Sequence, residues 1–328
     1  MRRTATPATG SVAGSTATVD PALTPSPRKP EGASAPGRSS GPVLAVDVGG
    51  TKLAVAVVDA DGRVTGRRSV PTPTSDDPDV VFGALSSLAV AVAADAPGPL
   101  VACGVGCGGP SDPAGGTVSP LNIPAWRGFP LARRLADTVG LPVAVDNDAR
   151  ALARAEGWLG AARGERDYLA MVVSTGVGAG IVLEGRLLSG AHGNAGHIGH
   201  VVVEPEGRPC ACGGIGCLEA EASGPSIAAA TGRAPAEASL EVRRRTGTLV
   251  GRAVASVANL LDLRLAVVAG SVALGFGDPF FSAAQEEIER RARLEFSAGT
   301  VIVPGGLGDL GPLVGAAAVA RHAAGLAP

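Results

Sequence analysis

Residues 43–59 read VLAVDVGGTKLAVAVVD, and this stretch predicts a β-hairpin. Strands are expected at 43–48 and 53–59, because both segments are apolar and a tight glycine turn separates them. The acidic residue Asp47 stands near the end of the first strand. An acid beside a glycine turn makes this hairpin a candidate binding element.

The turn of this hairpin consists of Gly49, Gly50, Thr51 and Lys52. Its glycines expose backbone N–H groups that can surround a phosphate, and the threonine and lysine add further donors. Asp47 could hold Mg²⁺ through water. The turn is not a P-loop, since GxxxxGK[ST] is absent and a strand follows it. An ordinary hairpin gives the same pattern, so this stretch alone leaves both interpretations open.

Residues 168–184 read YLAMVVSTGVGAGIVLE and repeat the plan of the first hairpin. A turn is expected at 175–180, with Thr175, Gly176 and Gly178 as its candidate phosphate-binding residues. An acidic residue and Gly-Arg then precede a further short strand, as in the first half of the chain. Two such hairpins are rarer by chance than one. The sequence therefore predicts an internal duplication, with two related domains that close on a nucleotide.

Further apolar segments alternate between strand and helix patterns, which predicts an α/β fold. Helices are expected at 80–94 (capped near Ser75 or Asp76), 131–139, 149–159, 239–263, 279–296 and 315–324, and strands at 64–70, 100–105, 265–269 and 300–303.

Length, net charge and composition limit the kinds of protein that this sequence can encode. A chain of 328 residues predicts about two domains. The net charge of −2 argues against a nucleic-acid or anionic-membrane partner. No apolar run approaches the roughly 20 residues that span a bilayer. Residues 1–41 are rich in Ser, Thr, Pro, Ala and Gly and are expected to be a disordered tail. No apolar segment follows Arg2 and Arg3, so a cytoplasmic location is expected.

The strand expected at 143–148 ends in three polar residues, Asp146-Asn147-Asp148. Ligands in α/β proteins bind at the carboxyl ends of strands. Asp148 is therefore a candidate general base. It is equally a candidate N-cap of the helix that follows.

Residues 104–109 read GVGCGG and match GxGxxG formally. A dinucleotide site is rejected, because Pro110 follows and no helix opens there. A sugar-contacting loop that includes Gly109 is the better interpretation. A second irregular loop carries Asn122.

Three of the five cysteines lie close together and follow a histidine, in the spacing H-x9-C-x-C-x4-C. Three thiols and an imidazole can complete a tetrahedral zinc site, and a closed site of this kind would be structural. A disulfide or free buried thiols are the alternatives. The candidate ligands are His200, Cys210, Cys212 and Cys217.

These motifs together resemble the ROK family of the actin-like sugar kinase superfamily. The resemblance covers about residues 43–325 and rests on DVGGTK, DNDA, STGVGAG, GNAGHIGH and CACGGIGCLE. It implies two ribonuclease-H-like α/β domains with a cleft between them, at 42–149 and 150–311. It also implies that a C-terminal helix at about 312–325 packs back on the first domain.

The resemblance assigns roles to the candidate residues. Asp148 would take the proton of the sugar 6-hydroxyl. The sugar pocket would contain Asn147, Glu219, His200, Asn122 and Gly109. The DVGGTK and STGVGAG turns would face the ATP phosphates, and Gly270-Ser271 the adenosine. Mg²⁺ and a structural Zn²⁺ would be the metals, and a homodimer is expected.

One position departs from the usual pattern of the family. Most of its sugar kinases read GEIGH, where the glutamate binds sugar hydroxyls, but this chain has His197 there. The GHIGH variant is similar to bacterial N-acetylmannosamine kinases. Such a sugar has no hydroxyl at C2 to donate to a carboxylate. The expected activity is thus ATP-dependent phosphorylation of the 6-hydroxyl of N-acetyl-D-mannosamine. A glucokinase and a sugar-responsive transcriptional regulator are the alternatives.

Overall fold

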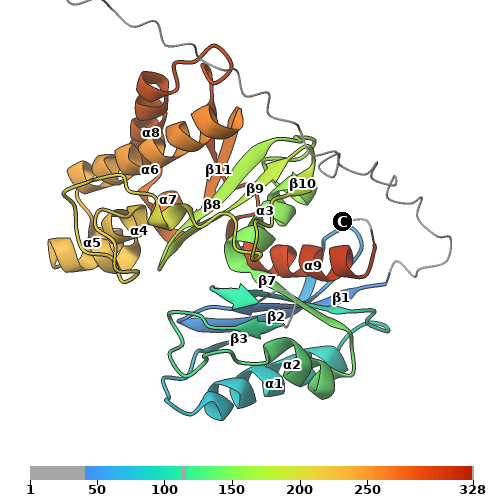
Figure 1. Ribbon diagram of the computed structural model, residues 1–328. Helices are drawn as coiled ribbons and strands as arrows, with labels where there is room; N and C mark the ends of the chain where they lie inside the picture. The colour runs from blue at the N-terminus through green and yellow to red at the C-terminus, as the bar shows by residue number, and fades with distance from the viewer. Residues whose placement is uncertain (1–40, 113–115, 327–328) are drawn as a thin grey trace, which may run out of the picture. The chain divides into compact units, whose positions relative to one another are not determined.

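The computed structural model describes residues 41–112 and 116–326, so the tail predicted at 1–41 lies outside the described part except for Gly41. Two five-stranded sheets form its framework (Figure 1). Their strand orders are β3-β2-β1-β4-β7 and β10-β9-β8-β11-β12. The two sheets therefore have equivalent strand orders, in agreement with the predicted duplication.

The first sheet begins with the predicted hairpin. Strand β1 pairs antiparallel with β2 and parallel with β4, and β4 pairs parallel with β7. The strands are β1 (Val43–Val48), β2 (Lys52–Val58), β3 (Val64–Pro71), β4 (Cys103–Cys107) and β7 (Val143–Asn147).

The second sheet follows the same pairing scheme. Strand β8 pairs antiparallel with β9 and parallel with β11, which pairs parallel with β12. The strands are β8 (Tyr168–Val173), β9 (Val177–Leu183), β10 (Arg186–Leu187), β11 (Leu265–Ala269) and β12 (Val301–Pro304).

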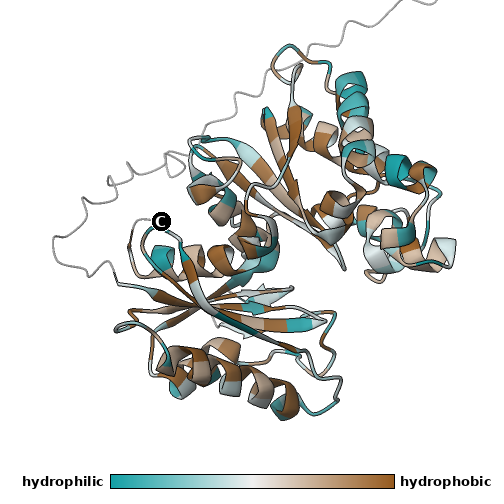
Figure 2. Cartoon of the chain, turned by 180° about the vertical axis from the view of Figure 1, so that it is seen from behind, coloured by the Kyte–Doolittle hydropathy of each residue, from teal (hydrophilic) through white to brown (hydrophobic). Residues whose placement is uncertain are grey.

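Alternate residues of β1 and β2 are buried against different helices, since successive side chains of a strand point to opposite faces. Leu44 and Val46 pack with α1 (Pro78–Ala94) and α2 (Leu131–Val139) on one face. Val43 and Ala45 pack with α9 (Gly311–Ala323) on the other face. Figure 2 shows the resulting apolar strands of both sheets.

Gly104 in β4 permits the close approach of α9. A methyl group at Gly104 would lie 1.9 Å from the Ala316 carbonyl oxygen and 2.7 Å from the Ala320 nitrogen. Such distances are impossible for a real side chain, so the glycine pattern of residues 104–109 serves helix packing in part. The helix predicted at about 312–325 does pack on the first sheet.

The second sheet is covered by α6 (Leu240–Leu261) and α8 (Asp278–Arg291) on one face. Helix α3 (Asp148–Leu159) packs on the other face through Ala153. Helices α3 and α9 also meet, because a methyl group at Gly315 would lie 2.8 Å from the Ala151 carbonyl carbon.

Short elements complete the described part of the chain. They are β5 (Ser111–Asp112), β6 (Thr117–Val118), η2 (Ile198–His200), α4 (Leu218–Ala222), α5 (Gly224–Thr231), η3 (Pro235–Glu237), α7 (Ser271–Phe276) and η4 (Gly308–Leu310).

Most predicted strands and long helices are confirmed, but several details were wrong. Strand β4 begins three residues later than predicted, and α8 ends at Arg291 instead of 296. The cap of α1 is Asp77, whose side chain accepts from the Asp79 nitrogen. The turn predicted at 175–180 is shorter, because β9 already begins at Val177. The helices α4 and α7 were not predicted.

None of the described helices is long and apolar enough to cross a membrane. The α/β fold with two related domains is confirmed. The exact domain limits at 149/150 and 311/312 stay a prediction.

Candidate active site

Asp148 lies where β7 ends and α3 begins. The helix cap is Asn147, whose Oδ1 accepts hydrogen bonds from the nitrogens of Ala149 (3.1 Å) and Arg150 (3.4 Å). The alternative assignment of Asp148 as the cap was therefore wrong. Asp148 is the first residue of the helix, and its own Oδ1 also accepts from the Ala149 nitrogen at 2.8 Å.

The electrostatic surroundings of Asp148 raise the pKa of its carboxyl group on balance. Burial raises the pKa of its carboxyl group, and the negative charge of Glu219 raises it further. The backbone hydrogen bond from Ala149 and the nearby His197 act in the opposite direction. A carboxylate with a raised pKa accepts a proton more readily than an ordinary aspartate, which is the property that a general base needs.

Asp47 has a similarly perturbed carboxyl group. Burial and the charge of Asp148 raise its pKa to about 7, while Lys52 and Arg67 lower it. The two acids thus share one electrostatic environment, although they come from β1 and α3. A bound cation would favour the ionised form of such a pair.

Gly109, Asn147 and His197 form one small group beside Asp148. A methyl group at Gly109 would lie 3.3 Å from Asn147 Nδ2 and 3.5 Å from His197 Nε2. His197 Nδ1 is 2.8 Å from the Asn194 carbonyl oxygen. A carbonyl oxygen only accepts, so His197 Nδ1 carries a proton and neutral His197 presents Nε2 as an acceptor.

Glu219 contacts the second glycine turn. Its Oε2 accepts a hydrogen bond from the Val177 nitrogen at 2.8 Å. Its charge also acts on Asp148, as described above. Glu219 therefore lies between the predicted base and a predicted phosphate-binding turn.

The first glycine turn is closed by backbone bonds. The Gly49 nitrogen donates to the Lys52 carbonyl oxygen at 3.0 Å. A methyl group at Gly50 would lie 2.5 Å from Asn122 Cβ, so the loop that carries Asn122 packs directly on this turn. Thr51 and Lys52 are exposed, with their side chains free to meet a ligand from solvent.

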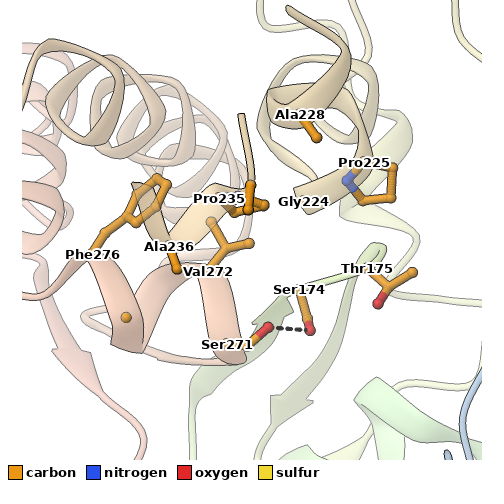
Figure 3. Close-up of a pocket in the computed structure, with 12 residues that line it drawn as sticks. Ser174, Thr175, Gly224, Pro225, Ala228, Pro235, Ala236, Ser271, Val272 and Phe276 are labelled. Atoms are coloured by element: carbon orange, nitrogen blue, oxygen red, sulfur yellow. Dashed lines mark hydrogen bonds between the residues drawn. The ribbon is translucent and has the colours of Figure 1, made fainter. Parts of the chain in front are cut away.

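A pocket of about 540 Å³ lies beside the second turn (Figure 3). Ser174 Oγ and Ser271 Oγ are 2.9 Å apart in a hydrogen bond, and Thr175 stands next to them. Most other lining side chains are apolar; they include Pro225, Ala228, Pro235, Ala236, Val272 and Phe276. Hydroxyls beside an apolar chamber suit a nucleoside with attached phosphates.

Two further candidate residues have clear backbone positions. Gly270 has φ = 100°, a conformation that favours glycine, and Ser271 begins α7 directly after it. Gly178 lies inside β9, where a methyl group would be 3.1 Å from Ala149 Cβ. Packing against Ala149 therefore favours glycine at position 178, independently of any contact with a phosphate.

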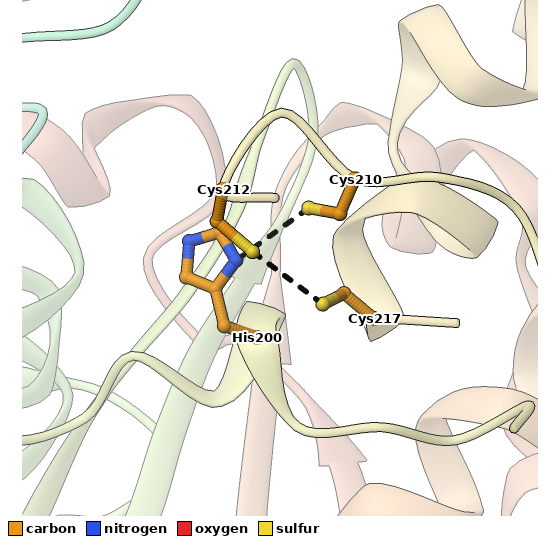
Figure 4. A group of neighbouring side chains, drawn as sticks. All are labelled: His200, Cys210, Cys212 and Cys217. Carbon is orange, nitrogen blue, oxygen red and sulfur yellow. Dashed lines mark hydrogen bonds between the residues drawn. The ribbon is translucent and has the colours of Figure 1, made fainter. Parts of the chain in front are cut away.

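The four candidate metal ligands come together as predicted (Figure 4). Their ligand atoms all lie within 4.8 Å of one another. Cys212 Sγ and Cys217 Sγ are 3.7 Å apart, as are Cys210 Sγ and His200 Nδ1. Sulfurs about 2.3 Å from one tetrahedral zinc ion would be about 3.8 Å apart, whereas a disulfide needs about 2 Å. The donor set fits zinc, and a disulfide is excluded.

Two thiols of the cluster have opposite electrostatic surroundings. The backbone N–H of Gly214 lowers the pKa of the Cys212 thiol, whereas burial raises that of Cys217 to about 12. A divalent cation would ionise both thiols. Cys103 and Cys107 belong to β4 instead, are fully buried, and lie outside this cluster.

Some residues of the site were missed from the sequence. Asn194 fixes the ring of His197, and Arg67 acts on Asp47 from β3. No sequence motif identified the pocket-lining residues Pro225, Pro235 and Phe276 either. Only folding brings these residues to the site, so no local pattern identifies them.

Comparison with known proteins agrees with this geometry. The sequence profile of the ROK family matches residues 43–323. The chain is 39% identical over 249 residues to an N-acetylmannosamine kinase of Citrobacter koseri. The matched region is 71% of this chain and 84% of that protein.

Two solved structures are similar over nearly all of their length. A ROK hexokinase from Thermus thermophilus has a TM-score of 0.75 and 35% identity, with 86% of this chain and 98% of that chain covered. A ROK family glucokinase from Streptomyces griseus was solved in complex with glucose and AMPPNP and has a TM-score of 0.76 and 30% identity. The match covers 86% of this chain and 100% of that chain.

Proposed function

The chain belongs to the ROK family and is an ATP-dependent sugar kinase, and on that premise we propose that it phosphorylates the 6-hydroxyl of N-acetyl-D-mannosamine. The predicted family and kinase class are thereby confirmed. The sugar, the reacting residues and the metals are the content of the proposal.

The observation that carries the choice of sugar is the position of His197. Its Nε2 lies near Gly109 and Asn147, and its Nδ1 is held by the Asn194 carbonyl oxygen. Neutral His197 would accept a hydrogen bond from the amide N–H of a 2-acetamido group. The similarity to relatives that are named N-acetylmannosamine kinases supports the same choice.

In the proposed reaction, Asp148 accepts the proton of the 6-hydroxyl as that oxygen attacks the γ-phosphorus, and the bond from the γ-phosphorus to the β–γ bridging oxygen breaks so that ADP leaves. Asn147, Glu219, His200 and Asn122 would hold the sugar. Backbone N–H groups of the two glycine turns would stabilise the charge that develops on the phosphates, and Lys52 would add a positive charge. Gly270 and Ser271 would contact the adenosine beside the pocket of Figure 3.

Two metals belong to the proposal. Asp47 would hold Mg²⁺ through water, and Mg²⁺ neutralises charge on the ATP phosphates. Zn²⁺ would be bound by His200, Cys210, Cys212 and Cys217. Because His200 Nδ1 faces Cys210, its Nε2 is the nitrogen left for a sugar hydroxyl. A homodimer is proposed from the family resemblance alone.

A panel of sugars tests the proposal. ADP release with Mg-ATP would be measured for N-acetylmannosamine, N-acetylglucosamine, glucose, mannose and fructose. We expect the highest kcat/KM for N-acetylmannosamine. The glucokinase alternative is favoured by the similarity to the Streptomyces griseus enzyme, and a preference for glucose would establish it.

A further inference from the structure

Glu219 is positioned to touch both proposed substrate sites. It lies in α4, two residues after the metal-ligating Cys217. Its Oε2 accepts from the Val177 nitrogen at 2.8 Å, directly after the turn at Ser174–Gly176. A methyl group at Gly176 would lie 3.0 Å from the same oxygen. The carboxylate therefore rests on the backbone of the phosphate turn.

A second bond ties the same corner of the chain to this turn. The Gly224 nitrogen donates to the Ser174 carbonyl oxygen at 2.8 Å. Ser226 Oγ donates to the Glu219 carbonyl oxygen at 3.1 Å, which joins α4 to α5. Gly224 also lines the pocket proposed for the nucleoside. The turn is thus held at Ser174 and at Val177 by one connected segment, residues 219–226.

The other carboxylate oxygen of Glu219 is available for a different partner. Within residues 41–112 and 116–326, hydrogen bonds from other residues to this carboxylate involve only Oε2. The turn that Glu219 contacts lies beside the proposed base, because a methyl group at Gly178, next to Val177, would lie 3.1 Å from Cβ of Ala149, the neighbour of Asp148. The charge of Glu219 also acts on Asp148. Oε1 is then the atom that a sugar hydroxyl would meet.

We infer that Glu219 is a positioning residue that couples sugar binding to nucleotide binding: Oε1 binds the sugar while Oε2 holds the phosphate turn. The inference rests on the proposed function. A sugar that fixes the carboxylate also fixes the Val177 N–H and, through residues 219–226, the wall of the nucleoside pocket. Nucleotide affinity must then rise when sugar is bound, and sugar affinity must rise by the same factor when nucleotide is bound.

The coupling factor is measurable without turnover. The Kd of Mg-AMPPNP would be determined by calorimetry in the absence of sugar and with saturating sugar. The sugar used is the one that gives the highest kcat/KM in the panel, so a wrong choice of substrate does not affect this test. We expect sugar to tighten nucleotide binding by at least about fivefold in the unaltered protein.

Gly176→Ala separates coupling from sugar recognition. The added methyl group would lie 3.0 Å from Glu219 Oε2, so this oxygen must shift by a few tenths of an ångström, which disturbs its hydrogen bond from the Val177 nitrogen more than it disturbs Oε1. The φ of Gly176 lies outside the range that only glycine tolerates, so the chain can accept alanine. We expect sugar affinity without nucleotide to change less than threefold and the coupling factor to fall below two. Glu219→Ala should lose the coupling as well.

Glu206→Ala is the matched control, because Glu206 is an exposed glutamate of the loop that precedes α4. It should keep the full coupling factor. The inference is overturned if the unaltered enzyme phosphorylates a sugar but binds nucleotide equally well with and without it. It is also overturned if Gly176→Ala keeps the original factor. Absence of turnover with every sugar would instead contradict the proposed function.

Discussion

The two halves of the molecule share one strand order but carry different chemistry at the same places. Asp47 stands second from the end of β1, whereas Val172 occupies that position in β8. Asp148 directly follows β7, whereas Gly305 directly follows β12. The first half thus supplies two interacting acids, and the second supplies hydroxyls and the candidate metal ligands.

Packing explains part of this divergence. A methyl group at Gly305 would lie 2.9 Å from both Glu156 Oε1 and Ala269 Cβ, so a side chain there would force its neighbours to move. The corresponding position after β7 has room for a carboxylate at the start of α3. A duplicated scaffold therefore provides equivalent strand ends, and local space decides which of them can carry a reactive group.

The largest effect is expected from Asp148→Asn. An amide cannot accept the hydroxyl proton, so kcat should fall by about 1,000-fold. Sugar affinity should change little, because the amide keeps the shape of the side chain. Steady-state ADP release and calorimetry with sugar alone would measure the two quantities. The exposed Asp137 on α2 offers a control, since Asp137→Asn should retain normal turnover. Near-normal kcat in the Asp148 variant would remove it from the base role.

Asp47→Asn should weaken Mg-nucleotide binding by about tenfold to 100-fold, the usual cost of losing a group that orients a metal's ligands. Sugar binding without nucleotide should stay unchanged. The matching change in the second half, Val172→Ala, should leave the metal dependence of nucleotide binding intact. Titration of Mg²⁺ at fixed AMPPNP would compare the variants. Equal Mg²⁺ dependence in the Asp47 variant and the unaltered protein would contradict this role.

The raised pKa of Asp47 gives a pH dependence with a defined sign. Its carboxyl group has a pKa of about 7 in the folded protein against 3.8 as the ordinary value. The folded state therefore holds more protons between pH 4 and 7, and its stability falls as pH rises through that window. Mg-nucleotide affinity should rise over pH 6–8, because the ionised form binds the cation. Thermal unfolding and calorimetry would follow both trends, and each slope should decrease in Asp47→Asn.

Cys212→Ser tests whether zinc is bound by the cysteines of the second half and not by those of the first sheet. The proposed zinc site predicts that this variant binds no zinc and unfolds several degrees lower, since a closed metal site stabilises the fold. Cys103→Ser, in β4 of the first sheet, should retain zinc. Elemental analysis of the purified proteins would count the metal. A zinc content of one per chain in both variants, or of none in the unaltered protein, would contradict the assignment.

The smallest expected effect concerns the choice of sugar. His197→Glu places a carboxylate acceptor at the position proposed to face C2 of the sugar. The ratio of kcat/KM for N-acetylmannosamine to that for glucose should fall by about tenfold or more, a typical effect of one exchanged contact. His192→Glu places the same charge on an exposed residue of the same loop and should leave the ratio unchanged. An unaltered ratio in the His197 variant would make this residue incidental to specificity.

The sequence predicted the strands of both hairpins closely, because valine-rich runs around glycine turns have a strong local signal. It also predicted the cluster of His200 and the three cysteines, since the ligand spacing is itself local. Element ends were less predictable: Asn147 competes with Asp148 for the cap of α3, and both residues have suitable side chains. The contacts of Asn194, Arg67 and Glu219 depend on the folded chain, so the sequence alone did not reveal them.

The most direct test of the central claim is a competition for phosphate. The enzyme would receive equal concentrations of N-acetylmannosamine and glucose with limiting Mg-ATP, and the products would be identified by NMR. The proposed function predicts N-acetylmannosamine 6-phosphate as the main product. Glucose 6-phosphate as the main product, or phosphate on another hydroxyl, would contradict it.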